Sequence, residues 1–172
     1  CILAVTLLLV LGVISSHESY QSINWQVIIL IAALIPIGTV MKTSGTAEWI
    51  GNFISSIAMK TPDDWQPRVI LALVYLIAMI LTEVSSNAAT AVIMTPVAIA
   101  VSNQMGLDAR PFVLAVAFAA SASFLTPVGY QTNLMVYGPG GYKFSDYIRV
   151  GFPLALLFWL TAIILLPIIW PV

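Results

Sequence analysis

Two short polar segments interrupt stretches of the chain that are otherwise almost free of charge. The first, TEVSSNAAT, covers residues 82–90, and the second, TPVGYQTN, covers residues 126–133. Ser and Asn favour helix starts, whereas Pro and Gly end or bend helices. Carbonyl groups freed where a helix breaks bind small cations, and free N–H groups at a helix start attract anions. The two segments therefore predict a site for a cation and an anion.

The rest of the sequence predicts that these segments lie inside a membrane. Of the 172 residues, 60% are hydrophobic and 8% are charged, whereas a soluble domain carries about 25% charged residues. No charge occurs between Glu18 and Lys42, between Arg110 and Lys143, or after Arg149. Charge-free blocks of about 20 residues match a hydrocarbon layer of ~30 Å. We expect an all-α integral membrane protein that crosses the cell membrane several times.

The hydrophobic pattern divides this single transmembrane domain, residues 1–172, into five parts. Residues 1–41 are expected to form two scaffold helices, over 1–16 and from about 25 to 41, and residues 46–60 a helix lying in the membrane interface. Residues 69–104 would span about 54 Å as one helix, so a break at the first polar segment leaves two arms of roughly 24 Å each. This length suits a re-entrant helical hairpin. Residues 110–137 are expected to form a discontinuous transmembrane helix, and residues 144–171 a terminal scaffold helix.

Composition also excludes several classes of function. One cysteine, Cys1, and one histidine, His17, exclude disulfide frameworks and most zinc sites, and the net charge of -1 offers no basic patch for nucleic acid. We find no sequence motif of an intramembrane protease and expect no enzyme and no organic cofactor. The chain opens on Cys without the charged start of a signal peptide, so we expect it to be a part of a longer protein.

Simpler interpretations of the polar residues stay open at this point. The Ser-Ser-Asn run suits an ordinary helix cap in an aqueous turn, and Thr126-Pro127 suits a proline kink. Glu83 is the one charged residue between Arg68 and Asp108. Intramembrane acids are candidates for cation binding or proton transfer. We favour a structural role for Glu83, paired with a residue in a missing half of the protein.

The two segments in their wider context resemble one known transporter family. The stretches TEVSSNAATAVIMTPVAIA and FLTPVGYQTNLMVYGPGGYKFSDYIRVG are similar to the hairpin tip and the unwound segment of the divalent anion:sodium symporter family, in its C-terminal inverted repeat. The resemblance implies sodium-coupled symport of a divalent anion, an N-terminal half with a second hairpin, a homodimer, and surrounding lipid. It also implies an elevator-like movement of the hairpin-bearing bundle against a scaffold.

The resemblance assigns roles to individual residues of this sequence. The substrate-binding positions carried over are Ser86, Asn87, Ala88, Tyr130 and Asn133. The sodium-binding positions carried over are Thr82, Ser85, Asn87, Pro127 and Gly129.

Two of these positions depart from the dicarboxylate carriers of the family. Ala88 stands where the family motif has Thr, so a hydroxyl that would contact a substrate carboxylate is absent. Tyr130 stands where dicarboxylate carriers have a small hydroxyl residue. The form PVGYQTN looks more like the sulfate-type permeases of the group, which favours sulfate over a dicarboxylate as the substrate.

Other functions of the same general class stay open as alternatives. A proton-coupled carrier, or an antiporter for metalloid anions or for sodium and protons, would use Glu83. A channel-like pore would use the re-entrant hairpin as a selectivity filter. The basic residues of the loops place the hairpin mouth in the cytoplasm by the positive-inside rule, whereas the resemblance places it outside. We follow the resemblance, because acidic residues lie among those basic residues.

Overall fold

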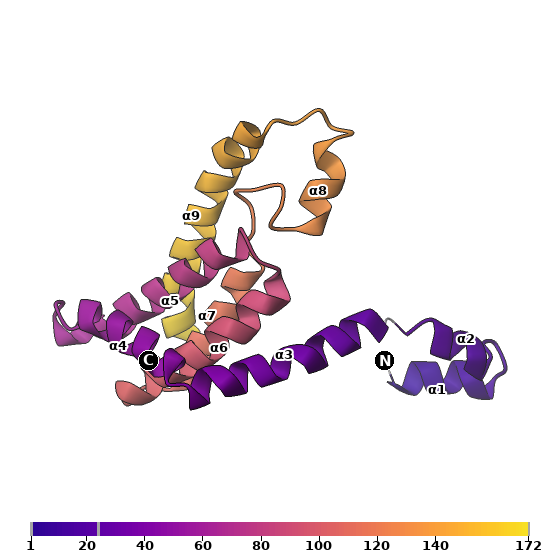
Figure 1. The fold of residues 1–172 in the computed structure, drawn as a ribbon, viewed down its shortest axis with the longest axis horizontal. Helices are drawn as coiled ribbons and strands as arrows, with labels where there is room; N and C mark the ends of the chain where they lie inside the picture. The colour runs from indigo at the N-terminus through magenta and orange to yellow at the C-terminus, as the bar shows by residue number, and fades with distance from the viewer. Residues whose placement is uncertain (1, 24, 172) are drawn as a thin grey trace. The chain divides into compact units, whose positions relative to one another are not determined.

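The structure is a computed structural model that describes residues 2–23 and 25–171, and the regular elements in these ranges are all helices (Figure 1). In chain order they are α1 (Ile2–Val10), α2 (Ser16–Gln21), α3 (Trp25–Thr43), α4 (Thr46–Ala58), the 3-10 turn η1 (Asp63–Trp65), α5 (Gln66–Thr82), α6 (Asn87–Gln104), α7 (Ala109–Ala120), α8 (Gln131–Tyr137) and α9 (Phe144–Ile169). Their contacts define two compact units, Cys1–Ala33 and Leu34–Val172. The candidate site lies in the second unit.

The first unit differs from the single helix predicted over residues 1–16. Helix α1 ends at Val10, and Gly12 then adopts a φ of 66°, a left-handed conformation that glycine accepts without steric cost. A second helix starts after Ser15, whose side chain accepts the backbone N–H of Glu18 while the Glu18 carboxylate accepts that of Ser15. This capping box explains why the chain forms two short helices here.

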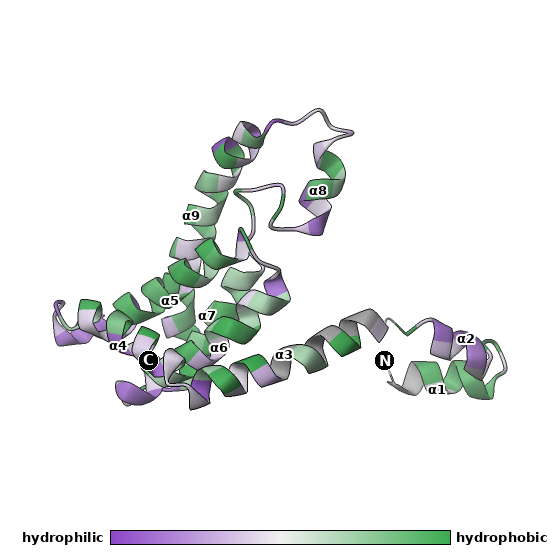
Figure 2. Ribbon diagram, in the orientation of Figure 1, coloured by the Kyte–Doolittle hydropathy of each residue, from purple (hydrophilic) through white to green (hydrophobic). Residues whose placement is uncertain are grey.

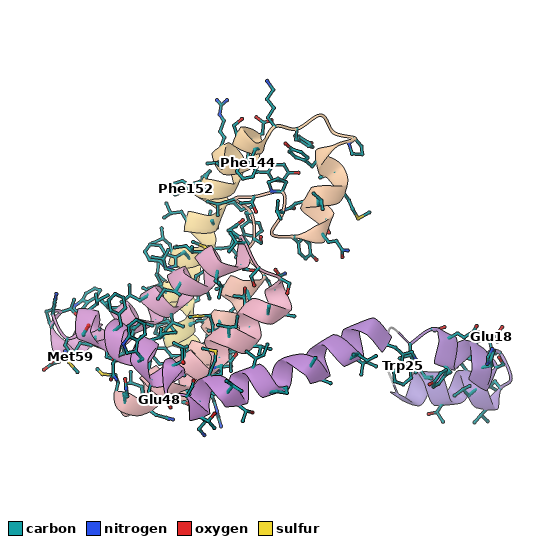
Figure 3. The ribbon with its side chains drawn as sticks, viewed as in Figure 1. Glu18, Trp25, Glu48, Met59, Phe144 and Phe152 are labelled. Carbon is teal, nitrogen blue, oxygen red and sulfur yellow. The ribbon has the colours of Figure 1, made fainter. Side chains whose placement is uncertain are left out.

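Helix α4 packs one face against α5 and α6 and leaves aromatic side chains on the other. Ile54 and Ala58 are fully buried, whereas Trp49 and Phe53 are 72% and 59% exposed. Figure 3 labels Glu48 and Met59 near the two ends of this helix. An exposed aromatic face opposite a buried one suits contact with lipid at a membrane interface, which is the location that the sequence predicts for residues 46–60.

Helices α5 and α6 form a helical hairpin joined by residues 83–86, which we call the turn (Figure 1). The arms have 17 and 18 residues, slightly more than the sequence predicts, because α5 begins at Gln66 with Pro67 in its first turn. Proline is favoured there, where its missing N–H has no helical partner. Among the described residues, the helical stretches Asp63–Thr82, Asn87–Met105 and Phe144–Ile169 are long and apolar enough to cross a membrane.

A non-helical segment separates α7 from α8. Helix α7 has 12 residues and ends at Ala120, and α8 has 7 residues and begins at Gln131. We call residues 121–130 the interruption. Both α5 and α6 pack against α7, and the core between them contains many small side chains, such as Ala78, Ala98 and Ala115. Small residues allow helices to approach closely in lipid.

Helix α9 packs against α5 and α7. The Trp159 indole N–H donates to the Ala72 carbonyl of α5 at 3.0 Å, and Gly151 is buried against the interruption. Apart from the buried Ala155 and Leu166, much of α9 exposes apolar side chains, including the labelled Phe144 and Phe152 in Figure 3. Figure 2 shows hydrophobic residues along most of α9. These contacts make α9 a part of the same packed bundle as the hairpin.

Candidate ion-binding site

The turn between α5 and α6 is organised by hydroxyl side chains. Ser86 is the N-cap of α6, and its side chain accepts the backbone N–H of Ala89 at 3.2 Å. The hydroxyl groups of Ser85 and Thr90 lie 3.2 Å apart. These contacts explain the sharp change of direction, because Ser at an N-cap satisfies a backbone donor that the helix leaves free.

Thr82 connects the end of α5 with the start of α6 and the end of α7. Its side chain is fully buried, and its hydroxyl lies 2.7 Å from the Ala120 carbonyl and 3.0 Å from the Asn87 amide oxygen. A hydroxyl carries one hydrogen, so it cannot donate fully to both oxygens. Three oxygen atoms from α5, α6 and α7 therefore gather at one buried point, and oxygen ligands are the kind that hard cations prefer.

The interruption is held against the turn by Glu83. This side chain is 8% exposed. One carboxylate oxygen accepts the backbone N–H groups of Phe124 and Leu125, both at 2.9 Å, and the other accepts that of Thr126 at 2.9 Å. Within the described part of the chain, no lysine or arginine forms an ion pair with Glu83. Three consecutive backbone donors thus face one acidic side chain.

Two further contacts bring the interruption close to the end of α5. The Thr126 hydroxyl donates to the Glu83 carbonyl at 2.9 Å and accepts the Gly129 N–H at 3.0 Å. A Cβ atom on Gly129 would overlap the Ser123 hydroxyl and would lie 3.0 Å from the Thr82 carbonyl oxygen. Gly129 is therefore needed for close approach, since only a residue without a side chain fits between these groups.

The opposite side of the interruption is fixed by α8 and α9. The Asn133 amide donates to the Ser123 carbonyl at 3.0 Å and to the Thr126 carbonyl at 3.3 Å. The Tyr147 hydroxyl of α9 donates to the Asn133 carbonyl at 2.9 Å. A Cβ atom on Gly151 would overlap the carbonyl group of Phe124. Several of the backbone groups that the break releases thus have partners within this chain, as burial in lipid requires.

The structure brings some of the predicted site residues together. Thr82 and Asn87 are in direct contact, and Gly129 lies beside the carbonyl of Thr82. Ser86 caps α6, so Asn87 and Ala88 are its first residues.

Other predicted residues have a different environment. The Ser85 hydroxyl contacts Thr90 and the Ser86 carbonyl, and the Asn133 amide is engaged by backbone carbonyls rather than directed into an open site. Pro127 is buried in the interruption, whereas Tyr130 is 48% exposed.

Sequence reasoning missed the partner of Glu83. We expected that partner in another part of the protein, whereas it is the backbone of residues 124–126 in the same chain. A signal was present: a helix break at membrane depth frees N–H groups that must find acceptors, and Glu83 is the one carboxylate between Arg68 and Asp108. No local sequence pattern predicted the roles of Ser123 and Gly151, because these roles depend on which helices pack against one another.

The charged side chains that the structure describes do not form a multidentate metal centre. Among the described residues, no group of three or more His, Cys, Asp or Glu side chains is close enough to hold a metal ion. The oxygens gathered around Thr82 are hydroxyl, amide and backbone carbonyl groups. A weakly bound monovalent cation is better matched to such neutral oxygens than a divalent ion, which favours carboxylate ligands.

Comparisons with known proteins identify a family of transporters. The chain matches a family model described as "Citrate transporter" over residues 2–117 and 89–172. It is 44% identical to an uncharacterized transporter of Synechocystis sp. over 94% of this chain and 26% of that protein. It is 30% identical to a probable sodium/sulfate cotransporter of Chlamydomonas reinhardtii over 94% of this chain and 18% of that protein.

A third relative is named for a different substrate, a dicarboxylate. The chain is 33% identical to a sodium-dependent high-affinity dicarboxylate transporter of Caenorhabditis elegans, over 76% of this chain and 22% of that protein. The chain thus spans about a quarter or less of the length of these relatives. The family-model match extends over both polar segments, and the names of the relatives agree with the predicted resemblance to divalent anion:sodium symporters. The chain belongs to the membrane transporter family that the citrate transporter model describes.

Proposed function

We propose that this chain is the C-terminal repeat of a sodium-coupled symporter for a divalent anion, with sulfate favoured over dicarboxylates. The observation that carries the proposal is the buried contact between the end of the hairpin and the end of α7, where Thr82 meets Ala120. Two broken helices meeting at one buried point are the arrangement that coupled transporters use for ions.

The length of α7 supports a re-entrant hairpin. Its 12 residues extend about 18 Å, less than the ~30 Å of the hydrocarbon layer. Helix α7 follows α6 after the short loop around Asp108, so α6 ends and α7 begins near the same membrane surface. Thr82, directly before the turn, contacts Ala120 at the far end of α7, so the turn would lie inside the membrane rather than at its opposite face.

The sodium ion would bind among the oxygens of Thr82, Asn87 and the Ala120 carbonyl. Helices α5 and α7 both end here, at Thr82 and Ala120. The free carbonyl groups at a helix C-terminus carry partial negative charge and favour a cation. We include Ser85, Pro127 and Gly129 in this site as the resemblance implies, with Gly129 allowing the close approach of the interruption.

The anion would bind on the α6 side of the turn, near Ser86, Asn87 and Ala88. The first residues of α6 combine free backbone N–H groups with the positive end of the helix dipole. Ala88 offers no hydroxyl for a second carboxylate, which favours a compact oxyanion such as sulfate, and relatives named as sodium/sulfate cotransporters agree with this choice. As the resemblance implies, Tyr130 would complete the anion site from the interruption side. Asn133 would contribute by holding the interruption through its hydrogen bonds to the Ser123 and Thr126 carbonyls.

Transport would follow from movement of the bundle that carries the hairpin. The contacts of α9 with α5, α7 and the interruption favour movement of α9 with that bundle rather than a scaffold role. We propose that the N-terminal half of the same protein supplies the second hairpin, and that two copies form a homodimer, as the resemblance implies.

The proton-coupled alternative depends on Glu83. Both of its carboxylate oxygens accept backbone N–H groups, and a protonated carboxyl would turn an O–H donor toward those donors. This geometry favours sodium coupling over proton transfer by Glu83.

The test is uptake of radiolabelled sulfate by the complete protein in proteoliposomes, with and without an inward sodium gradient. We expect sodium-driven uptake that excess unlabelled sulfate inhibits and succinate does not. Inhibition by succinate would contradict the preference for sulfate but would remain consistent with sodium-coupled symport of a divalent anion. Sulfate uptake at the same rate with and without the sodium gradient would contradict sodium coupling.

The site itself is tested by Asn87→Ala. We expect this variant to insert into the membrane normally and to lose sodium-dependent uptake, because it removes the amide oxygen beside Thr82. Asn103→Ala is the matched control, since Asn103 is exposed near the other end of α6. Normal uptake by Asn87→Ala would show that the site lies elsewhere.

A further inference from the structure

The backbone of the interruption needs an acceptor that helical geometry no longer provides. Helix α7 ends at Ala120, and residues 124–126 lie outside any helix. Their N–H groups are therefore free of helical partners, and within a membrane such groups must be satisfied by other parts of the protein. Three consecutive free donors form a concave site for an anionic group.

Glu83 fills this need from the neighbouring hairpin. Its two carboxylate oxygens accept the N–H groups of Phe124, Leu125 and Thr126 at 2.9 Å each. A carboxylate has only acceptor sites, so it matches a set of donors better than any neutral side chain of similar size. Hydrogen bonds to charged groups are also shorter and stronger than neutral ones.

The same residue is held from its backbone side. The Thr126 hydroxyl donates to the Glu83 carbonyl at 2.9 Å, and the Ser123 hydroxyl lies 3.4 Å from both the Glu83 carboxylate and the Thr82 carbonyl. Glu83 follows Thr82 directly, and a Cβ atom on Gly129 would lie 3.1 Å from the Glu83 Cα. The position of Glu83 therefore sets the separation between the Thr82 oxygens and Gly129.

We propose that Glu83 is a positioning residue for the sodium site, which ties the interruption to the turn so that both sides of the site keep one geometry. It acts through the backbone of residues 124–126 and neither binds the cation itself nor carries a proton. This inference rests on the proposed function for its transport consequences. Its structural part, the link between Glu83 and residues 124–126, is independent of the transported ion.

Glu83→Gln is the discriminating variant. The amide has nearly the same shape, but its NH2 group would face a backbone N–H of the interruption, so one of the two carboxylate acceptors is replaced by a donor. We expect the sodium concentration for half-maximal uptake to rise at least tenfold. Hydrogen exchange of a peptide covering residues 121–130 should become at least tenfold faster, while exchange in the middle of α5 stays unchanged.

Two companion variants keep the test decisive. Asp64→Asn removes one carboxylate charge at an exposed position in η1 and should leave both measurements unchanged. Thr126→Val keeps the Glu83 carboxylate and removes the hydroxyl that donates to the Glu83 carbonyl. It should shift both measurements in the same direction as Glu83→Gln but by less, and it provides the test if Glu83→Gln does not fold.

The outcomes separate the possible roles of Glu83. If Glu83 carried a proton, uptake by the Glu83→Gln variant would no longer depend on pH. If Glu83 is a positioning residue, the substitution would raise the half-saturating sodium concentration by a similar factor at each pH. Unchanged exchange over residues 121–130 in a folded Glu83→Gln variant would overturn the proposal. If the unmodified protein shows no sodium dependence, the proposed function fails, and the exchange measurement still tests the link between Glu83 and the interruption.

Discussion

Gly129→Ala tests the close approach of the interruption to the hairpin. The backbone of Gly129 does not adopt a positive φ, so alanine meets no conformational penalty there. The added Cβ would instead overlap the Ser123 hydroxyl and press on the Thr82 carbonyl oxygen at 3.0 Å and on the Glu83 Cα at 3.1 Å. Two of these three neighbours are backbone atoms, which cannot rotate away as a side chain does.

The expected cost follows from the packing of this region. Inserting a methyl group into a well-packed core costs about 1–3 kcal/mol. The added methyl group would press on the Thr82 carbonyl oxygen, which lies beside the proposed sodium site. We therefore expect this cost to reduce the free energy of sodium binding. A penalty of about 1–3 kcal/mol corresponds to a weakening of apparent sodium affinity by roughly 5- to 150-fold.

The assay is sodium-dependent uptake by the complete protein in proteoliposomes, with the sodium concentration varied at fixed substrate. Gly138→Ala is the matched control, because a Cβ on Gly138 meets nothing within 4 Å and its φ of -69° suits alanine. Ser123→Ala combined with Gly129→Ala should recover part of the lost affinity. Removing the Ser123 hydroxyl leaves the new methyl group with no neighbour closer than the Thr82 carbonyl oxygen at 3.0 Å.

The reasoning would be refuted if folded Gly129→Ala bound sodium as well as the unmodified protein. It would also be refuted if Ser123→Ala failed to improve the Gly129→Ala variant while Ser123→Ala alone was active. Either result would mean that the interruption does not approach Thr82 as closely as the structure shows.

Two predictions concern the packing of α9. Gly151→Ala should lower the thermal unfolding temperature by several degrees, because its Cβ would overlap the Phe124 carbonyl group, whereas Gly38→Ala, with an ordinary 3.5 Å contact to Pro96, should not. Trp159→Phe should lower the free energy of unfolding by about 0.5–1.5 kcal/mol, because it removes the donor to the Ala72 carbonyl. In the same denaturant titration, Trp49→Phe is the control, since Trp49 is 72% exposed, and an equal loss there would contradict the role of the hydrogen bond.

The sequence alone determined the features that depend on local composition. The scarcity of charge predicts a membrane protein, and the Ser86 cap predicts the start of α6, because both signals act within a few residues of the chain. Pro127 and Gly129 lie inside the interruption, but the predicted break at residues 126–133 was displaced, because α7 already ends at Ala120 and α8 begins at Gln131. The resemblance to a transporter family came from these same two segments, and the family match agrees with it.

Local signals also had clear limits within the sequence. The capping box of Ser15 and Glu18 divides the first predicted helix, although the apolar run up to residue 16 suggested one continuous element. Here a specific hydrogen-bonding pattern prevailed over the hydrophobic pattern, because N-capping stabilises a new helix start after the flexible Gly12.

The tertiary structure decided the use of each polar group in the site. Glu83 meets the backbone of residues 124–126 about 40 positions later in the chain, Asn133 supports the Ser123 carbonyl, and Gly151 accommodates the Phe124 carbonyl. These partners follow from the packing of α5, α7 and α9 against one another. Helix packing decides which backbone donors a buried carboxylate contacts, and it brings together residues that are far apart in the chain. No local pattern in the sequence encodes such a pairing.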